Sequence, residues 1–231
     1  MNHPHIIGLS GPAGSGKDTV ADLLVEHAGF KKLSFADTLR AELSDAFAID
    51  LEFLTRRETK EHPISCLALS RCLDDAFVGF MMRLYERTGQ RLDLDAPNSP
   101  RHAMQQWGDY RRTQDPEYFV AKTRALVSYL LRERLASRVV VTDCRFANEV
   151  EMARRSFGGQ LWQICRDGVA AAPGSHVSET TGAEFRADVV LNNSHTVGHL
   201  QERVLEALWT QTTGLAPGSL RVIIDQAAEL A

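Results

Sequence analysis

Apolar positions along the chain follow two alternating spacings, and the alternation predicts an α/β fold. Short runs of Val, Ile and Leu bounded by glycines or polar residues are typical of buried strands, whereas apolar residues three and four positions apart predict amphipathic helices. We predict strands at residues 6–10, 32–35, 139–142, 161–165 and 189–191. We predict helices at residues 17–27, 36–46, 101–112, 118–135, 147–157 and 197–210. This order favours a three-layer fold with a mostly parallel central sheet and helices on both faces.

One long segment interrupts this alternation. Residues 49–98 are helical in character but rich in charged and loop residues, and residues 92–100 read as a loop that leads into the next helix. We interpret residues 49–98 as a substrate-binding insertion within one domain that covers residues 1–231. A short apolar run at 220–224 has no functional interpretation.

Composition limits the classes of function. The chain has 231 residues, enough for an α/β domain with a substantial core, and its net charge of −4 argues against a general polyanion binder. The four cysteines show no metal-ligand spacing, so we expect reduced thiols. The sequence shows neither a signal-peptide pattern nor an apolar stretch long enough to span a membrane, which favours a cytoplasmic location.

A glycine-rich turn after the first predicted strand carries the clearest chemistry. Residues 11–17 read Gly-Pro-Ala-Gly-Ser-Gly-Lys, the Gly-x4-Gly-Lys pattern of a phosphate-binding P-loop. Glycines let backbone N–H groups turn toward an anion, Lys17 adds a positive charge, and the following helix presents its positive end. The residues predicted to bind the nucleotide are Gly11, Ala13, Gly14, Ser15, Gly16, Lys17, Asp18 and Thr19.

The residue after Lys17 departs from the usual pattern. Asp18 stands where a Ser or Thr hydroxyl normally binds Mg²⁺, and Thr19 follows it. Asp18 either reaches the metal, directly or through water, or simply suits the first turn of a helix, where negative charge is favoured. The pattern leaves both interpretations open.

A second cluster follows the predicted strand at 139–142. Asp143 comes directly after three valines and a threonine, at the strand end where open α/β sheets bind ligands. P-loop enzymes place there the acidic residue that holds Mg²⁺, so we predict Asp143 as a metal ligand; the alternative is a helix cap. Arg145 is positioned to reach a transferring phosphate. Asn148 and Glu149 either orient Arg145 or open the next helix.

Basic side chains that suit an acceptor phosphate gather in the first half of the chain. Helical spacing places Arg101, Gln105 and either Asp109 or Arg112 on one helix face, where arginine suits a phosphate and an amide suits a base edge. The alternative is a solvated face with ordinary ion pairs. Arg40 follows the second strand, and a basic patch within the insertion contains Arg56, Arg57 and Lys60.

Further candidates lie in the last third of the chain. Arg166 begins a stretch of small residues that reads as a mobile lid at about 166–182, for which His176 and Glu179 would be anchors. Asn192 and Asn193 follow the last core strand, at a place where an adenine can be contacted.

Together these motifs resemble the phage-type deoxynucleoside monophosphate kinases, relatives of the cellular nucleoside monophosphate and dephospho-coenzyme A kinases. The matching runs are 9–19, 35–40, 100–108, 143–149, 176–179 and 188–193, within a span of roughly 5–208. The Lys-Asp-Thr sequence at 17–19 looks like this family's own form of the P-loop. Similarity is lowest in the insertion, the region that would select the acceptor base.

The resemblance implies a P-loop kinase fold with a core, an acceptor-binding region and a lid. It implies transfer of the γ-phosphoryl group of ATP, with Mg²⁺, to a deoxynucleoside 5′-monophosphate, for phage DNA precursor supply. Lys17, Asp143 and Arg145 would be catalytic, and Asp18 and Asp143 would hold the metal. Arg166 and Asn192 would contact ATP. The acceptor would contact Asp37, Arg40, Lys60, Arg101, Gln105, Arg112 and Glu179.

Other acceptors and one other class of protein remain open. A P-loop kinase of this kind could act on a hydroxymethylated base in DNA or on a small metabolite such as dephospho-coenzyme A, and a non-catalytic nucleotide-binding module is the third alternative. The acidic net charge disfavours nucleic acid as a partner. The expected partners are therefore small nucleotides and a second copy in a homodimer, without a membrane.

Overall fold

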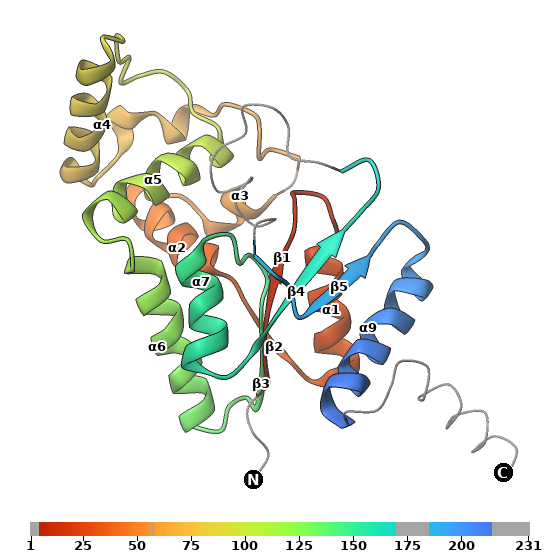
Figure 1. The fold of residues 1–231 in the computed structure, drawn as a ribbon. Coiled ribbons are helices and arrows are strands. Elements are labelled where there is room, and N and C mark those ends of the chain that lie inside the picture. Colours follow the sequence, from red (N-terminus) through yellow and green to blue (C-terminus); the bar gives the residue numbers. More distant parts are fainter. Residues whose placement is uncertain (1–4, 57, 170–184, 214–231) are drawn as a thin grey trace, which may run out of the picture. The chain divides into compact units, whose positions relative to one another are not determined.

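The structure, a computed structural model, describes residues 5–56, 58–169 and 185–213 (Figure 1). The chain divides into two compact units. The P-loop unit comprises Met1–Leu33 and Leu126–Ala231, and the helical unit comprises Ser34–Ala125. The insertion predicted at 49–98 lies inside the helical unit, which extends beyond it on both sides.

A five-stranded sheet forms the centre of the P-loop unit. Its strands are β1 (His5–Ser10), β2 (Lys31–Leu33), β3 (Arg138–Val141), β4 (Gln160–Cys165) and β5 (Val189–Asn192), in the order β2-β3-β1-β4-β5. All four strand pairs are parallel, so the carboxyl ends of the strands meet at one edge of the sheet. The predicted α/β fold with a parallel central sheet is confirmed, and the parallel pairing extends to every described strand.

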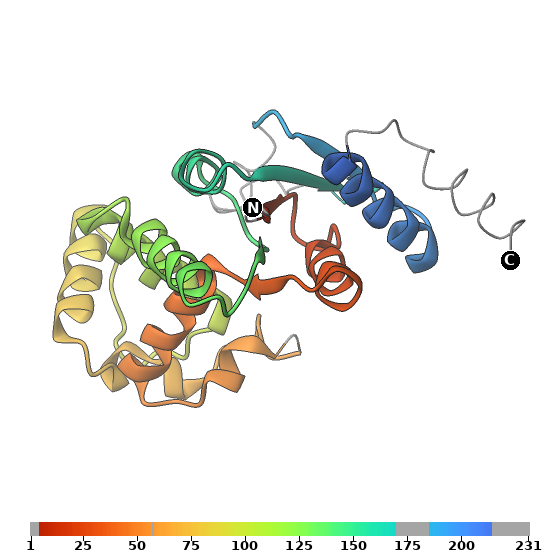
Figure 2. The ribbon, with the colours of Figure 1, turned by 90° about the horizontal axis from the view of Figure 1, so that it is seen from below.

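Helices cover both faces of this sheet (Figures 1 and 2). α1 (Lys17–Ala28) and α9 (Val197–Thr213) lie on one face, and α7 (Ala147–Glu151) with the π-helix Met152–Ser156 lies on the other. Because side chains alternate along a strand, Ile7 and Leu9 of β1 join the core beneath α1 and α9, while Gly8 faces Ala153 of the π-helix. No described helix is both long enough and apolar enough to cross a membrane.

Local capping explains where the predicted boundaries fail. The strand predicted at 32–35 is wrong at its end, because Ser34 caps α2 (Phe35–Phe47). The Ser34 hydroxyl accepts a hydrogen bond from the Ala36 N–H, and the Asp37 carboxylate accepts one from the Ser34 N–H at 2.8 Å. The helix predicted at 147–157 is divided, since α7 passes into the π-helix after Glu151.

The helical unit packs around a cluster of aromatic side chains. Its helices are α2, α3 (Leu51–Thr55), α4 (Asp75–Thr88), α5 (Pro100–Gln114) and the first half of α6 (Tyr118–Arg132), with two 3₁₀ turns at Ser65–Leu67 and Leu69–Arg71. The ring centroid of buried Phe77 on α4 lies 4.9 Å from Trp107 and 5.4 Å from Tyr110, both on α5. These contacts fix α4 against α5. The sequence did not predict α3 or α4.

Candidate functional site

The P-loop lies at the carboxyl edge of the sheet, between β1 and α1. Gly11, Gly14 and Gly16 have φ angles of 138°, 81° and 100°, a region that other residues rarely adopt. At two of these positions a side chain would also clash with neighbouring atoms. A Cβ atom on Gly11 would lie 2.3 Å from the Ile164 carbonyl oxygen, and one on Gly16 would lie 2.1 Å from Nδ2 of Asn193. The glycine spacing that identified the loop is therefore a requirement of its backbone.

Lys17 bends back over the loop from the first position of α1. Its ammonium group donates hydrogen bonds to the carbonyl oxygens of Gly11 at 2.8 Å and Pro12 at 2.7 Å. The positive charge therefore lies over the loop itself, at the positive end of α1. Ser15 is fully buried, and its hydroxyl oxygen has no hydrogen-bond partner among the described residues. These features form a preorganised anion site.

Asn193 ties the P-loop to the strand on the far side of β4. Its backbone N–H donates to the Cys165 carbonyl oxygen at 2.7 Å, and its side-chain amide donates to the Ser15 carbonyl oxygen at 2.9 Å. The sequence suggested adenine contact for Asn192 and Asn193. Asn193 instead holds the loop, while the Asn192 side chain accepts a hydrogen bond from the Ser194 N–H. The role predicted for Asn192 toward ATP stays a prediction.

The turn after β3 is fixed against the strand that leads into the P-loop. The Cys144 N–H donates to the Leu9 carbonyl oxygen at 2.9 Å, which places the flanking Asp143 and Arg145 beside the end of β1. The next support is Glu149, whose side chain is only 3% exposed. One of its carboxylate oxygens accepts the backbone N–H groups of Arg145 at 2.7 Å and Phe146 at 3.1 Å. Glu149 thus contacts the backbone of the Arg145 turn and also caps the start of α7, so both interpretations of this residue stay open.

The thiol of Cys144 packs into the sheet. It is fully buried, and a Cβ on Gly8 would lie 2.7 Å from its sulfur. Burial raises the pKa of this thiol well above its ordinary value, and the charges of Glu149 and Asp143 act in the same direction. Cys144 is therefore a neutral packing residue. All four cysteines are free thiols.

The predicted metal ligands suit Mg²⁺ but not a cage built of protein alone. The part of the chain that the structure describes contains no group of three His, Cys, Asp or Glu side chains able to hold a metal. Mg²⁺ is usually bound by one or two carboxylates together with phosphate oxygens and water, and the oxygens of Asp18 and Asp143 match that donor set.

Lys32 engages one of these two carboxylates. Its ammonium group lies 3.2 Å from Asp18 and 2.9 Å from Asp22. Burial alone would lower the pKa of Lys32, but the hydrogen bonds and charges of Asp22 and Asp18 outweigh burial and raise it. A metal at Asp18 therefore competes with a protonated lysine.

In the helical unit, the predicted acceptor residues are paired with carboxylates. Arg40 forms an ion pair with Asp37 at 2.9 Å, one turn earlier on α2. Arg101 forms an ion pair with Glu61, and its backbone N–H donates to the Lys60 carbonyl oxygen at 3.0 Å. An acceptor phosphate at Arg40 or Arg101 therefore exchanges with a carboxylate.

Farther along α5, the predicted acceptor residues Gln105 and Arg112 lie in different environments. Gln105 is partly buried, and the guanidinium carbon of Arg112 lies 5.1 Å from the centroid of the Phe119 ring. A Cβ on Gly108 would lie 2.7 Å from a guanidinium nitrogen of Arg112. The head of Arg112 is thus held against its own helix, one turn back.

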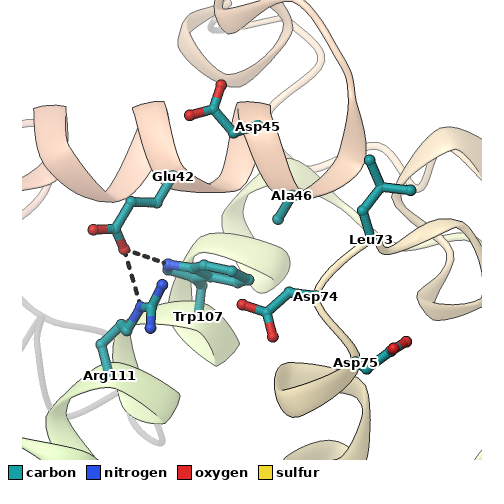
Figure 3. A pocket seen from close by; sticks show the side chains of 8 residues that line it. All are labelled: Glu42, Asp45, Ala46, Leu73, Asp74, Asp75, Trp107 and Arg111. Carbon is teal, nitrogen blue, oxygen red and sulfur yellow. Dashed lines mark hydrogen bonds and ion pairs between the residues drawn. The ribbon is translucent and has the colours of Figure 1, made fainter.

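Sequence reasoning missed the carboxylate at the centre of the helical unit. Glu42 on α2 accepts hydrogen bonds from the Trp107 indole at 3.0 Å and Arg111 Nε at 3.1 Å (Figure 3). Its other carboxylate oxygen accepts one from the Tyr118 hydroxyl at 2.5 Å. Its side chain is 17% exposed. Burial alone would raise the pKa of Glu42, but the hydrogen bonds from Tyr118 and Trp107 and the charge of Arg111 lower it. Glu42 borders an open acidic cavity of about 540 Å³ with Asp45, Asp74 and Asp75. Only contacts between residues far apart in sequence reveal this network.

Some predicted site residues fall outside the described residues. These are Glu179, its companion His176, Arg57, and the predicted lid beyond Val169. Arg166 is described and exposed, and its carbonyl oxygen accepts the Val169 N–H in a tight turn. Ala13 is exposed on the P-loop, and Thr19 is partly buried in the first turn of α1.

Comparison with known proteins gives one informative likeness. The chain is 27% identical over 206 residues to a protein of Acanthamoeba polyphaga mimivirus that is provisionally named a deoxynucleotide monophosphate kinase, covering 88% of this chain and 95% of that protein. No family model matches the chain.

Among solved structures, TT1252 from Thermus thermophilus is 21% identical with a TM-score of 0.46, covering 91% of this chain and 99% of the other. Dephospho-CoA kinase from Campylobacter jejuni is 13% identical with a TM-score of 0.49, covering 90% and 98%. These two likenesses are too low to carry a functional conclusion.

Proposed function

We propose that this protein transfers the γ-phosphoryl group of ATP to a deoxynucleoside 5′-monophosphate and releases the diphosphate and ADP. The observation that carries the proposal is the P-loop, in which three glycines with positive φ angles and Lys17 form an anion site at the positive end of α1. The mimivirus relative supports the same reaction through its name, over nearly the whole of both chains.

Each part of the P-loop unit has a task in this reaction. The loop N–H groups and Lys17 hold the β- and γ-phosphates, and Lys17 exchanges the Gly11 and Pro12 carbonyl oxygens for phosphate oxygens when the nucleotide binds. Arg145, on the turn fixed by Glu149, neutralises charge that develops on the transferred group. Most of the rate enhancement then comes from in-line positioning and electrostatic stabilisation.

Asp143 and Asp18 are the residues that would hold Mg²⁺ beside the phosphates. A magnesium ion bound there would offset the negative charge of the phosphates. Asp18 takes part once its carboxylate separates from Lys32, which lies 3.2 Å away.

The helical unit supplies the acceptor contacts in this proposal. Arg40 and Arg101 each exchange a carboxylate, Asp37 or Glu61, for the phosphate of the monophosphate. A phosphate carries more charge than a carboxylate and accepts more hydrogen bonds, so the exchange is favourable for a dianion. This requirement favours an acceptor with a terminal phosphate over a neutral hydroxyl on a base.

The deciding experiment measures ADP release from Mg-ATP with a panel of acceptors. The panel contains the deoxy- and ribonucleoside monophosphates, hydroxymethylated pyrimidine monophosphates, dephospho-coenzyme A and DNA that contains hydroxymethylated bases. The Lys17→Ala protein serves as the blank for contaminating kinases. We expect turnover with one or a few deoxynucleoside monophosphates.

Other outcomes separate the alternatives. Turnover with dephospho-coenzyme A or with DNA alone would contradict the acceptor and retain the phosphoryl transfer. Tight ATP binding without turnover on any acceptor would contradict the enzyme itself and favour a nucleotide-binding module.

A further inference from the structure

A groove between α4 and α5 gathers basic side chains of the helical unit, and no P-loop residue lines it. Its volume is about 620 Å³, and all of its lining residues belong to the helical unit. From α4 these are Phe80, Arg83, Leu84 and Arg87, and from α5 they are Asp109, Arg112 and Thr113. Three guanidinium groups therefore face one cavity that contains a single carboxylate.

Two of the three arginines of this groove have no carboxylate partner among the described residues. Arg83 and Arg87 are exposed, and neither forms an ion pair with any other residue that the structure describes. They lie four positions apart on α4, where like charges destabilise a helix. Arg40, Arg101 and Arg111 in the same unit are each matched with a carboxylate. The groove therefore brings two arginines without a carboxylate partner among the described residues to one cavity.

Each helix of the groove carries a glycine four residues before one of the groove arginines. Arg83 follows Gly79 by four residues on α4, and Arg112 follows Gly108 by four residues on α5. A Cβ on Gly79 would lie 3.2 Å from a guanidinium nitrogen of Arg83, and one on Gly108 would lie 2.7 Å from Arg112. Glycine weakens a helix interior, so this repeated spacing sacrifices helix stability and gives each guanidinium group room against its own helix.

We propose that the α4–α5 groove is a second nucleotide site, which binds the phosphate of a nucleoside phosphate at Arg83, Arg87 and Arg112. The partly buried Phe80 and Leu84 offer an apolar wall for the base, and Asp109 and Thr113 offer polar atoms for its exocyclic groups or the sugar. The volume lies within the range of small-molecule sites.

A free nucleotide fits this groove better than a nucleic acid strand. A strand needs basic side chains that continue along a track, with aromatic side chains for successive bases. The basic residues that line the groove are only Arg83, Arg87 and Arg112. Three arginines in one cavity suit one phosphate-bearing molecule better than a strand with successive phosphates.

The test measures nucleotide binding by calorimetry in the full chain with Lys17→Ala, so that P-loop binding is weakened and no turnover is needed. The probes are ATP, dTMP, inorganic tripolyphosphate and a twelve-residue thymidine oligonucleotide. The groove variant adds Arg83→Gln and Arg87→Gln. The matched control adds Arg71→Gln and Arg91→Gln, two exposed arginines of the same unit that do not line the groove.

We expect ATP or dTMP to bind with an affinity at least tenfold lower in the groove variant and changed less than twofold in the control. Nucleotide should also protect Arg83 and Arg87 from phenylglyoxal in the unsubstituted protein, a readout that does not depend on how a variant folds. Equal binding in the two variants, or no protection, would overturn the proposal.

Two other outcomes would also overturn it. Tripolyphosphate that binds as tightly as ATP would show that the groove does not recognise the nucleoside. Binding of the oligonucleotide alone would show that the ligand is a strand and not a free nucleotide. Because these readouts need no phosphoryl transfer, a failed acceptor panel leaves them interpretable.

Discussion

The two units hold their charged groups by different means. In the P-loop unit, the main chain holds Lys17, which bonds to two carbonyl oxygens, and Glu149, which accepts two backbone N–H groups. The ion pairs of Lys32 with Asp18 and Asp22 are an exception. In the helical unit, side chains hold side chains, as in Arg40 with Asp37 and Arg101 with Glu61. A ligand that binds therefore displaces mainly backbone contacts in the P-loop unit and side-chain ion pairs in the helical unit.

The two units differ in the kind of protein partner that a bound phosphate displaces. A phosphate at the P-loop replaces neutral carbonyl partners of Lys17, and the backbone donors are already in place. A phosphate at Arg40 or Arg101 displaces a charged carboxylate. We therefore expect substitutions in the P-loop unit to change turnover most, and those in the helical unit to change stability most.

The largest effect should follow Lys17→Ala. Removal of the ammonium group that reaches the phosphates should lower turnover by about 10²–10³-fold or more, as loss of one preorganised donor does elsewhere. Unfolding should change little, because the lysine is only partly buried. Steady-state ADP release and thermal unfolding measure the two quantities.

Lys31→Ala is the matched control for this substitution, since Lys31 is exposed on β2. Turnover of Lys17→Ala close to that of the control would sink the assignment of the P-loop.

A smaller effect on turnover should follow Glu149→Gln. The amide keeps an oxygen that can accept the Arg145 and Phe146 N–H groups but loses the charge that strengthens both hydrogen bonds. We expect kcat to fall about tenfold, a barrier increase of about 1.4 kcal/mol, with KM for ATP within about twofold. Glu149→Ala should lower kcat further. If kcat/KM is unchanged while only the unfolding temperature falls, Glu149 supports the fold and not the Arg145 turn.

Glu42→Gln tests the helical unit. At neutral pH the substitution should lower the free energy of unfolding by about 1–3 kcal/mol, since it weakens hydrogen bonds to Trp107, Arg111 and Tyr118. The Trp107 indole contacts the substituted group, so tryptophan fluorescence during urea unfolding reports this loss. Nucleotide affinity at the P-loop should stay within twofold of the unsubstituted protein.

The pH dependence of that loss follows from the sign of the pKa shift. The pKa of folded Glu42 lies below its ordinary value of 4.5, so its stabilisation is fully present above pH 4.5. It disappears as the pH falls through the lower pKa of the folded state. The stability difference between the unsubstituted protein and the Glu42→Gln variant should therefore shrink below pH 4.5, and a difference that grows there would contradict the network.

The smallest effect should follow Lys32→Ala. Its ion pairs with Asp18 and Asp22 are partly exposed, and such pairs contribute about 0.2–1 kcal/mol. Release of Asp18 should lower the Mg²⁺ concentration needed for half-maximal activity by a few-fold. An unchanged Mg²⁺ requirement would leave Asp143 as the metal ligand without Asp18.

The sequence predicted the P-loop unit well where its features depend on neighbouring residues: Gly11 and Gly16 have positive φ angles, and the five strands are short apolar runs. The close approaches of Gly11 to Ile164 and of Gly16 to Asn193 could not be predicted, because these residues are far apart in the sequence. The end of β2 was wrong because Ser34 begins a capping box instead of extending the strand. Strand propensity alone does not show whether Ser34 extends β2 or caps α2.

The helical unit was less predictable, because its organisation depends on distant pairs. Glu42 meets Trp107 and Tyr118, which lie more than sixty residues later in the chain. In α4 the core residues Phe77 and Met81 lie within a run of apolar residues and one glycine at 76–82, so the sequence does not mark a single buried helix face. Arg40 and Arg101 were predicted as phosphate ligands. Glu61, the partner of Arg101, lies 40 residues away in the sequence, whereas helical spacing could have revealed Asp37 as the partner of Arg40.

The position of β1 also constrains how the protein is made. β1 precedes the helical unit in the chain, yet both strands that flank it, β3 and β4, are synthesised after the whole helical unit. The helical unit can bury its aromatic cluster before β3 and β4, the strands that pair with β1, have been synthesised; Ile6 and Ile7 of β1 stay unpaired until then. Such long-range parallel pairing folds slowly and leaves apolar strand edges exposed meanwhile. We expect nascent chains that end before Arg138 to depend on chaperones, and longer chains to lose that dependence once β4 has emerged.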